Sequence, residues 1–400
     1  MKHLFNILSG KVTTFMQVWR REYYLVFHDL GVMLFFFALT IGYPIVYTLI
    51  YNPEIVENIP IAVVDHSRTQ QSRRLAQMID ATQGVEVYDY VPNLQDARRL
   101  QNEHKVYGVL EIPADYAKRI GRGQQGVATF YAEMSLLLRY RTFLSALTDV
   151  ELASGSEIRR QAIDIIGLPA QDMNGLPVES ESVMLGDPTQ GFASFIMPGI
   201  LVLILQQSML LGVTMLAAGV KERRRRFGGI DPETIPAGAM TTIWAKTLCY
   251  VTLYIPICVY VLNLVPIMFN LPHIGSFPQM FIFILPMLIA AAFMGQAISV
   301  FVTERESSLL VIVFTSVVFL FLSGLTWPRY AMSDIWTWVG DAIPATWGVE
   351  GFIRMNSNGS PLWEQARPYT MLWILAACYM TLAWLVTRFS SPRSRLAPTK

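Results

Sequence analysis

The chain has 400 residues, of which 53% are hydrophobic and 15% are charged, and its mean hydropathy is +0.38. A soluble protein that hides its apolar side chains in cores does not have this balance, so the composition indicates a membrane protein. The 31 lysines and arginines are matched by 30 acidic residues, and this net charge gives no indication of a nucleic-acid partner.

Residues 1–29 are basic and lie ahead of the first apolar run, where we expect a cytoplasmic amphipathic helix. Charged residues are then absent from five stretches, at 30–53, 188–220, 247–303, 307–328 and 368–387. About 20 apolar residues cross the bilayer core as a helix. The third stretch is long enough for two crossings, which the proline- and glycine-containing turn at 270–278 separates. The sequence therefore predicts an α-helical polytopic membrane protein with six transmembrane helices.

Residues 54–187 alone have a soluble composition, with 13 lysines and arginines and 19 acidic residues. Residue alternation predicts strands at 59–64, 85–90, 106–112 and 127–131. Candidate caps and helical spacing predict helices from Ser67 to about Thr82, after Asn93, at 114–120 and at 135–166. We therefore expect an inserted α/β domain between transmembrane helices 1 and 2, followed by a linker at 167–187. The chain has no metal-ligand or catalytic motif that would indicate an enzyme.

The distribution of lysine and arginine predicts the orientation. With both termini in the cytoplasm, the inner segments carry 15 of these residues and the short outer segments carry three. The α/β domain is left out of this count because long translocated domains do not follow the rule. The sequence thus predicts a multi-pass protein with both termini inside and an extracytoplasmic α/β domain. The first apolar run lacks a cleavage site, so we expect it to remain as an anchor.

Three groups of residues, in this order along the chain, resemble the ABC-2 type permeases, the membrane subunits of bacterial ABC exporters. The first group is Val18-Trp-Arg-Arg-Glu-Tyr-Tyr24, which is similar to the interfacial elbow helix of that family. The second is the loop with Lys221-Glu222, Phe227-Gly228, Ile235-Pro236 and Trp244-Ala-Lys246. The third is the series Leu322-Ser-Gly324, Trp327-Pro328, Met332, Trp336, Pro344-Ala-Thr346-Trp347, Gly351 and Arg354. The four consecutive arginines at 223–226 and Trp347 depart from the usual family pattern.

The resemblance implies a subunit of an ATP-driven exporter in the bacterial cytoplasmic (inner) membrane. It implies a second permease subunit, identical or related, and a separate cytoplasmic ABC ATPase that binds ATP and Mg, since this chain has no P-loop and is expected to bind no cofactor. It leaves room for a periplasmic adaptor protein. The expected segments are the cytoplasmic helix 1–29, transmembrane helix 1 at 30–53, the α/β domain at 54–187, transmembrane helix 2 at 188–220, the coupling loop at 221–246, transmembrane helices 3–5 at 247–328, an outer re-entrant segment at 329–367, transmembrane helix 6 at 368–387 and a cytoplasmic tail at 388–400.

A different class stays open, namely a membrane-anchored sensor or assembly factor whose outer domain binds a partner. The four spans that follow the α/β domain favour the exporter. Because the expected translocation path holds no charged residue, we expect a hydrophobic or amphipathic substrate such as a drug or a lipid. The candidate path residues are the strongly polar side chains within the spans: Gln206, Gln207, Asn263 and Gln296. These side chains could instead form hydrogen bonds between helices, and we favour this role over contact with the substrate.

The resemblance assigns contact with the ATPase to the end of the elbow helix and to the loop after transmembrane helix 2. The candidate residues are Arg20, Arg21, Glu22, Glu222, Arg223, Phe227, Gly228, Ile235 and Pro236. We expect a short coupling helix at about 230–239. For the basic residues, anchoring on anionic lipid is the alternative.

The outer segment is rich in tryptophan, yet its prolines and aspartates prevent one continuous span. We expect two short helices that enter the outer leaflet and gate the path, with Pro344 and Gly351 as bends and Glu350 or Arg354 as polar latches. The candidate gate residues are Trp327, Pro328, Pro344, Trp347, Glu350, Gly351 and Arg354. An aromatic belt that only sets the depth of the protein in the membrane is the alternative.

The orientation can be tested by labelling introduced cysteines in intact cells. A cysteine at Gln124 should react with a membrane-impermeant reagent, whereas a cysteine at Gly229 should not, because charge asymmetry places these positions on opposite sides. The reverse labelling pattern would exclude the predicted orientation.

Overall fold

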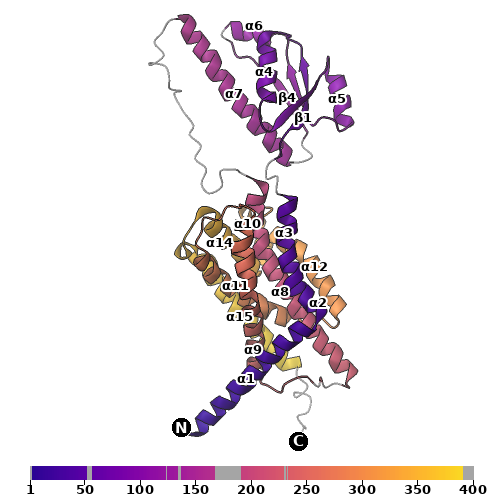
Figure 1. Ribbon diagram of the computed structural model, residues 1–400, viewed down its shortest axis with the longest axis vertical. Helices are drawn as coiled ribbons and strands as arrows, with labels where there is room; N and C mark the ends of the chain where they lie inside the picture. Colours follow the sequence, from indigo (N-terminus) through magenta and orange to yellow (C-terminus); the bar gives the residue numbers. More distant parts are fainter. Residues whose placement is uncertain are drawn as a thin grey trace. The chain divides into compact units, whose positions relative to one another are not determined.

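The structure is a computed structural model that describes residues 2–51, 56–122, 124–133, 137–166, 191–228, 231 and 233–390. The chain divides into two compact units. Met1–Asn52 together with Met184–Lys400 form a helical unit, and Pro53–Val183 form the α/β domain (Figure 1). The linker predicted at 167–187 and residues 391–400 of the predicted tail lie outside the described residues.

Among its described residues, the helical unit contains six stretches that are long and apolar enough to cross a membrane, which agrees with the number predicted from the sequence. Helix α1 (Lys2–His28) precedes them. The first stretch comprises α2 (Leu30–Met33), the π-helical turn η1 (Leu34–Leu39) and α3 (Thr40–Ile50). The others are α8 (Phe192–Arg226), α9 (Ala239–Val259) with η3 (Tyr260–Leu264) and α10 (Val265–Met268), α11 (Phe277–Ile298), α12 (Arg305–Leu322), and η5 (Leu362–Gln365) with α15 (Ala366–Ser390).

Helix α8 lies at the centre of this unit, where it packs against α11, α12 and α14 (Pro344–Asn358) and against η1. Close contact with η1 requires a glycine, since a Cβ atom at Gly212 would come within 2.0 Å of the Phe36 ring. Small residues commonly allow such close approach between membrane helices. Most of the spanning part of α8 is buried, whereas α12 exposes an apolar face that includes Leu310, Phe314 and Phe321.

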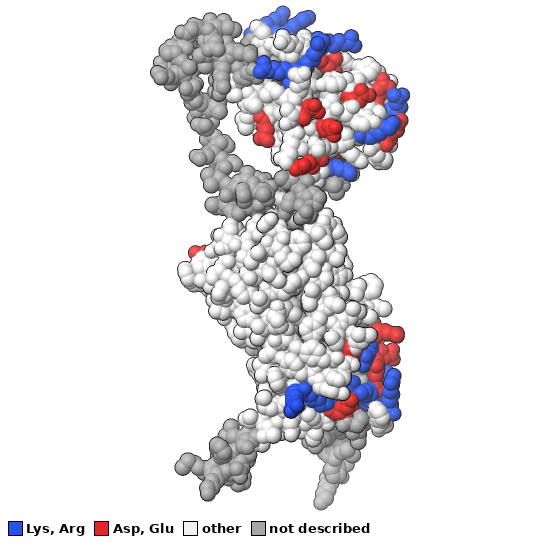
Figure 2. Space-filling view, viewed as in Figure 1, with Lys and Arg blue, Asp and Glu red and all other residues white. Residues whose placement is uncertain are grey.

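Several helices extend beyond the uncharged stretches from which they were predicted, and α8 and α9 do so most clearly. Helix α8 continues through the four arginines to Arg226, and α9 begins at Ala239, ahead of Lys246. Arginine and lysine are good helix formers whose long side chains reach solvent from a membrane helix, so a charge marks the end of the apolar layer and not the end of the helix. We call the end of the helical unit that carries Arg223–Arg226 the basic end. Figure 2 shows charged side chains of this unit gathered at one end, next to a broad uncharged surface.

The outer segment forms two short α-helices, as the sequence predicted. After the 3-10 turn η4 (Arg329–Ala331), α13 spans Asp334–Asp341, and α14 follows almost directly. Pro344 is the first residue of α14, where a missing backbone N–H costs nothing. The expected bend at Gly351 is wrong, because α14 runs through it without interruption. Gly351 instead lets α14 approach α11, since a Cβ atom there would lie 2.1 Å from the Phe283 ring.

The α/β domain is built on a four-stranded sheet with the order β2-β1-β3-β4, in which β1 is parallel to both neighbours and β4 is antiparallel to β3. Helices α4 and α7 contribute to the core on one face of the sheet, and α5 covers the other face. The elements are β1 (Ile59–Asp65), α4 (Gln70–Asp80), β2 (Val85–Tyr90), α5 (Leu94–Asn102), β3 (Gly108–Ile112), α6 (Tyr116–Gly121), β4 (Thr129–Ala132) and α7 (Leu137–Ile166).

Local capping chemistry explains where the first helices of this domain begin. Asn93 caps α5 as predicted, since its side chain accepts a hydrogen bond of 2.8 Å from the Asp96 amide. The predicted cap at Ser67 is wrong. The carboxylate of Asp65 accepts the amides of Ser67 and Arg68 in a turn, and α4 therefore begins later, behind Thr69.

Candidate functional site

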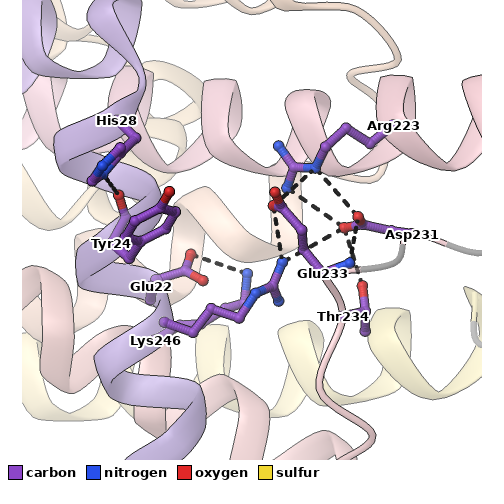
Figure 3. Close-up of polar contacts among 9 residues, drawn as sticks. Glu22, Tyr24, His28, Arg223, Asp231, Glu233, Thr234 and Lys246 are labelled. Carbon is purple, nitrogen blue, oxygen red and sulfur yellow. Dashed lines mark hydrogen bonds and ion pairs between the residues drawn. The ribbon is translucent and has the colours of Figure 1, made fainter.

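The basic end brings together the end of α1, the end of α8, residues 231 and 233–238, and the start of α12. Figure 3 shows how Arg223 of α8, Asp231, Glu233 and Thr234 lie next to α1. The four arginines at 223–226 occupy the last turn of α8, where positive charge is favourable against the helix dipole. The helix then ends at Phe227, and Gly228 adopts a positive φ of 69° that suits glycine. These features direct the chain from α8 back towards α1.

Asp231 fixes the course of the loop after α8. Its side chain is fully buried, and its carboxylate accepts hydrogen bonds from Arg223 Nε at 3.3 Å and from the amide of Glu233 at 3.1 Å. Thr234 donates its hydroxyl to the same carboxylate, and the Arg21 guanidinium lies 3.8 Å away. Burial raises the pKa of Asp231, but the hydrogen bonds from Arg223, Glu233 and Thr234 more than offset this, so its pKa lies below the usual value. The loop is thus held by α1 and α8 together.

Glu22 connects α1 to α9. Its side chain is only 2% exposed, and its carboxylate accepts hydrogen bonds from Lys246 at 3.1 Å and from the hydroxyl of Tyr250. A buried carboxylate without such partners would carry a large desolvation penalty. These two contacts of Glu22 therefore hold α1 against α9.

A second connection, between α11 and α12, is also tied to α8. Lys221 donates to the backbone carbonyls of Ser299, Val300 and Val302 at 2.6 to 2.9 Å. These carbonyls follow the end of α11, where helix geometry leaves such groups without partners. A single lysine of α8 therefore supplies hydrogen bonds to the backbone that follows α11.

Arg305, the first residue of α12, completes this set of contacts. Its guanidinium lies 2.8 Å from Asp29 and 3.4 Å from Glu222, and its own amide donates to Glu222 at 3.0 Å. Glu222 and Asp29 thus bring the start of α12 against α8 and against the junction of α1 and α2.

The predicted coupling residues fall into two groups. The side chains of Arg21, Glu22, Glu222 and Arg223 form the ion pairs described above. Arg20, Phe227, Gly228 and Pro236 are exposed and Ile235 is half-buried; the Phe227 side chain has 61% of its surface accessible. Contact of either group with an ATPase stays a prediction.

The coupling helix predicted at about 230–239 is wrong for the described residues. Glu233 lies in a turn, residues 234–238 are not helical, and α9 starts at Ala239. The Asp231 carboxylate binds the amide of Glu233, and the Asp231 carbonyl accepts the amide of Thr234, so the chain closes a tight turn instead of a helix. Pro236 then lacks the N–H that a helix interior requires.

Two of the four polar residues predicted within the spans connect helices. Gln206 accepts a hydrogen bond of 2.6 Å from the Ala345 amide at the start of α14, and Gln296 donates to Thr247 of α9 at 2.8 Å. Asn263 is half-buried in η3. Both polar atoms of the Gln207 amide are buried and have no hydrogen-bond partner among the described residues. The four side chains therefore do not form one polar cluster.

In the outer segment, Arg329 binds three of its neighbours. The guanidinium forms ion pairs with Asp341 and with Glu350, and it lies over the ring of Trp347 with 4.8 Å to the centroid. Glu350 also pairs with Arg354 at 3.0 Å, while Trp347 is almost fully buried and donates to the Asp341 carbonyl. Trp327, which lies between α12 and η4, is 57% exposed. The predicted gate residues Trp347, Glu350 and Arg354 thus lie together, whereas Trp327 faces outward.

Sequence reasoning did not assign functional roles to Lys221, Asp231, Arg305 and Arg329, which hold these two regions together. A signal was present for Lys221, Arg305 and Arg329, since each lies at or close to the end of an uncharged stretch, whereas Asp231 lies within the loop. The distant partners could not be identified, because Arg305 pairs with Asp29 and Asp231 with Arg21 across more than half of the chain.

The sequence model of the family described as "ABC-2 family transporter protein" matches residues 30–385. No curated protein matches the chain. The matched range covers all but a few residues of the helical unit's six apolar stretches and includes the α/β domain.

The ion pairs of Asp231 should contribute measurably to stability. We expect Asp231→Asn to destabilise the protein by about 2–4 kcal/mol, because two arginines lose a buried counter-ion while keeping some contact with solvent. Glu304→Gln removes an exposed carboxylate from Arg225 at the same end and should cost below about 1 kcal/mol. Thermal and denaturant unfolding of the detergent-solubilised protein measures both.

The difference in stability between the wild type and Asp231→Asn should depend on pH. The pKa of Asp231 is lowered in the folded state, so its contribution is complete above the ordinary aspartate pKa of about 3.9 and is lost as the pH falls through the lowered value. The stability difference between the wild type and Asp231→Asn should therefore be largest near neutral pH. Equal stability of the two proteins at pH 7 would contradict the role given to Asp231.

Proposed function

The chain belongs to the ABC-2 family of transporter proteins, and we propose that it is the permease subunit of an ATP-driven exporter. Members of this family are membrane components of ABC transporters. The observation that carries the proposal is the match of the family's sequence model to residues 30–385. This range includes five of the six apolar stretches completely and most of the sixth. ATP and Mg²⁺ would bind to a separate cytoplasmic ATPase, and the work of this chain would be conformational.

We place the basic end in the cytoplasm and the outer segment on the far side of a bacterial inner membrane. The excess of lysine and arginine at the basic end supports this orientation. The α/β domain, inserted between the first and second spans, would then be extracytoplasmic, where an adaptor protein could bind it.

The ATPase would contact the exposed surface formed by Phe227, Thr234 and Pro236, which we call the docking loop. An exposed phenylalanine and an exposed proline offer the apolar side chains typical of an interface centre. Directly beneath it, Asp231 and Glu233 connect the loop to Arg21 and Arg223. A movement of the ATPase would therefore reach α1 and α8 through ion pairs and not through a flexible linker.

A second permease subunit would complete the pathway. The exposed apolar faces of the first span and of α12 support this, because they carry large side chains such as Leu34, Phe314 and Phe321. The unpartnered amide of Gln207 indicates a place where water, substrate or the second subunit supplies hydrogen bonds. A path with amides and no charged residue suits a hydrophobic or amphipathic substrate.

The outer segment would close the far end of the path. Arg329, Asp341, Glu350 and Arg354 connect η4, α13 and α14, so these elements would move together. Opening would require these ion pairs to rearrange, which makes them a latch.

The docking loop can be tested by removing its apolar anchor. Phe227→Ala should weaken binding of the cognate ATPase by about tenfold or more, because a phenylalanine buried at an interface loses its apolar contact. Phe389→Ala removes a similarly exposed phenylalanine near the end of α15 and should have little effect. Co-purification and titration of the two subunits measure the affinity, and equal binding of both variants would exclude the docking loop.

The outer latch can be tested by separating ATP hydrolysis from export. Glu350→Gln leaves Arg329 and Arg354 without their shared partner, so we expect export to fall about fivefold or more while ATP hydrolysis continues. Asp334→Asn makes the same charge change at an exposed position of α13 and serves as the control. Normal export by the Glu350 variant would leave the aromatic belt as the role of this segment.

A further inference from the structure

A cavity of about 310 Å³ lies at the basic end, where α1 and α2 meet α8 and α12. Its polar lining is formed by Tyr24, His28, Asp29, Arg223, Glu233 and Arg305. Leu25, Leu30 and Leu216 form an apolar wall on the same cavity. The proposed transport function assigns no role to this space.

The charges on the lining are balanced and arranged as two opposed pairs. Arg223 lies 3.4 Å from Glu233, and Arg305 lies 2.8 Å from Asp29. These side chains keep partial exposure and can therefore exchange some of their contacts for a ligand. A ligand with a single sign of charge would satisfy one member of each pair and repel the other, whereas a zwitterion can satisfy both.

Aromatic and imidazole groups on α1 favour a cationic group in the same cavity. The rings of Tyr24 and His28 are stacked with 3.7 Å between centroids (Figure 3). His28 Nδ1 donates to the carbonyl of Tyr24 at 2.9 Å, so Nε2 of the neutral ring is an acceptor. An ammonium group is attracted both by such an acceptor and by an aromatic face.

The cavity lies next to the apolar surface of the first span. Leu30 lines the cavity and is 84% exposed, and Leu34, one turn further along the span, is 53% exposed. The change from charged lining to exposed leucine is the change that a phospholipid presents between its headgroup and its acyl chains. A soluble zwitterion would gain nothing from these leucines.

We propose that this cavity binds the headgroup of a zwitterionic phospholipid, with the phosphate at Arg223 and Arg305 and the amine at Asp29, Glu233 and the Tyr24–His28 pair. The acyl chains lie along Leu30 and Leu34. Because Arg305 and Asp29 connect α12 to the α1–α2 junction, the bound lipid contacts every element that meets at the basic end except α9 and α11. The proposal concerns a resident lipid and does not depend on which substrate is exported.

Native mass spectrometry of the full-length protein in detergent, titrated with defined lipids, tests the site. Phosphatidylethanolamine should bind about tenfold more tightly than phosphatidylglycerol, which has the phosphate without the amine. Arg223→Gln should weaken phosphatidylethanolamine about tenfold, whereas Arg226→Gln, one turn further along α8 and outside the cavity, should not. For the amine, Glu233→Gln should weaken phosphatidylethanolamine in the same way, and Glu304→Gln, outside the cavity, is its control.

A further variant separates recognition from folding. Tyr24→Leu removes an exposed aromatic ring and keeps all of the ion pairs, so the protein should unfold at nearly the same temperature while its preference for phosphatidylethanolamine falls. The proposal is overturned by equal affinity for the two lipids, by wild-type affinity in Arg223→Gln, or by an unchanged preference in Tyr24→Leu. Soluble phosphoethanolamine should bind far more weakly than the lipid. Equal affinity for the two would show that the cavity is a site for a soluble ligand and not for a lipid. Because the measurement is binding, its failure leaves the exporter function untouched, and loss of export alone leaves the lipid site untouched.

Discussion

Buried carboxylates beside the apolar layer of this protein are held in ion pairs, and the arrangement of the basic end depends on that constraint. Glu22 and Asp231 are both almost completely buried, and each has cationic partners on a different element. An unpaired carboxylate at such a place would be strongly unfavourable. The pairs therefore favour the packing of α1, α8 and α9 that is observed, because this packing brings both carboxylates to their partners.

The same constraint attaches two connecting segments at the basic end to α8. The loop after α8 is bound through Arg223, and the connection between α11 and α12 is bound through Lys221 and Glu222. A charged hydrogen bond has a stricter geometry than an apolar contact, so displacing either connection would displace the end of α8 with it. This arrangement suits a protein that must receive a mechanical signal at that end.

The sequence was sufficient where structure depends on neighbouring residues. The uncharged stretches indicated the six spans, the alternation of β2 indicated its limits, and Asn93 indicated the start of α5. It was insufficient where a distant partner decides the local structure. The loop at 231–238 carries a proline and two acidic residues that suit a helix start, yet the Asp231 side chain is held by Arg21 and Arg223 and takes up the amide of Glu233 instead. Gly351 similarly has the local signature of a bend, but the Phe283 ring of another helix explains why it is glycine.

Both regions that we assign to transport are attached to one helix. At the basic end, Arg223 holds the loop after α8, and Gln206 of the same helix accepts the Ala345 amide in the first turn of α14. The 35 residues of α8 extend over about 52 Å, which is enough to cross the membrane with a turn or two beyond it. A buried hydrogen bond from Gln206 is costly to break in an apolar layer, so a shift of α8 either moves the start of α14 with it or exchanges that bond for another. Gln207, whose amide has no partner among the described residues, lies next to it on the same helix. The helix therefore carries one amide that binds the outer segment and an adjacent one without a partner among the described residues. In the exporter that we propose, substrate contact and gating would both depend on α8, whose other end lies at the basic end.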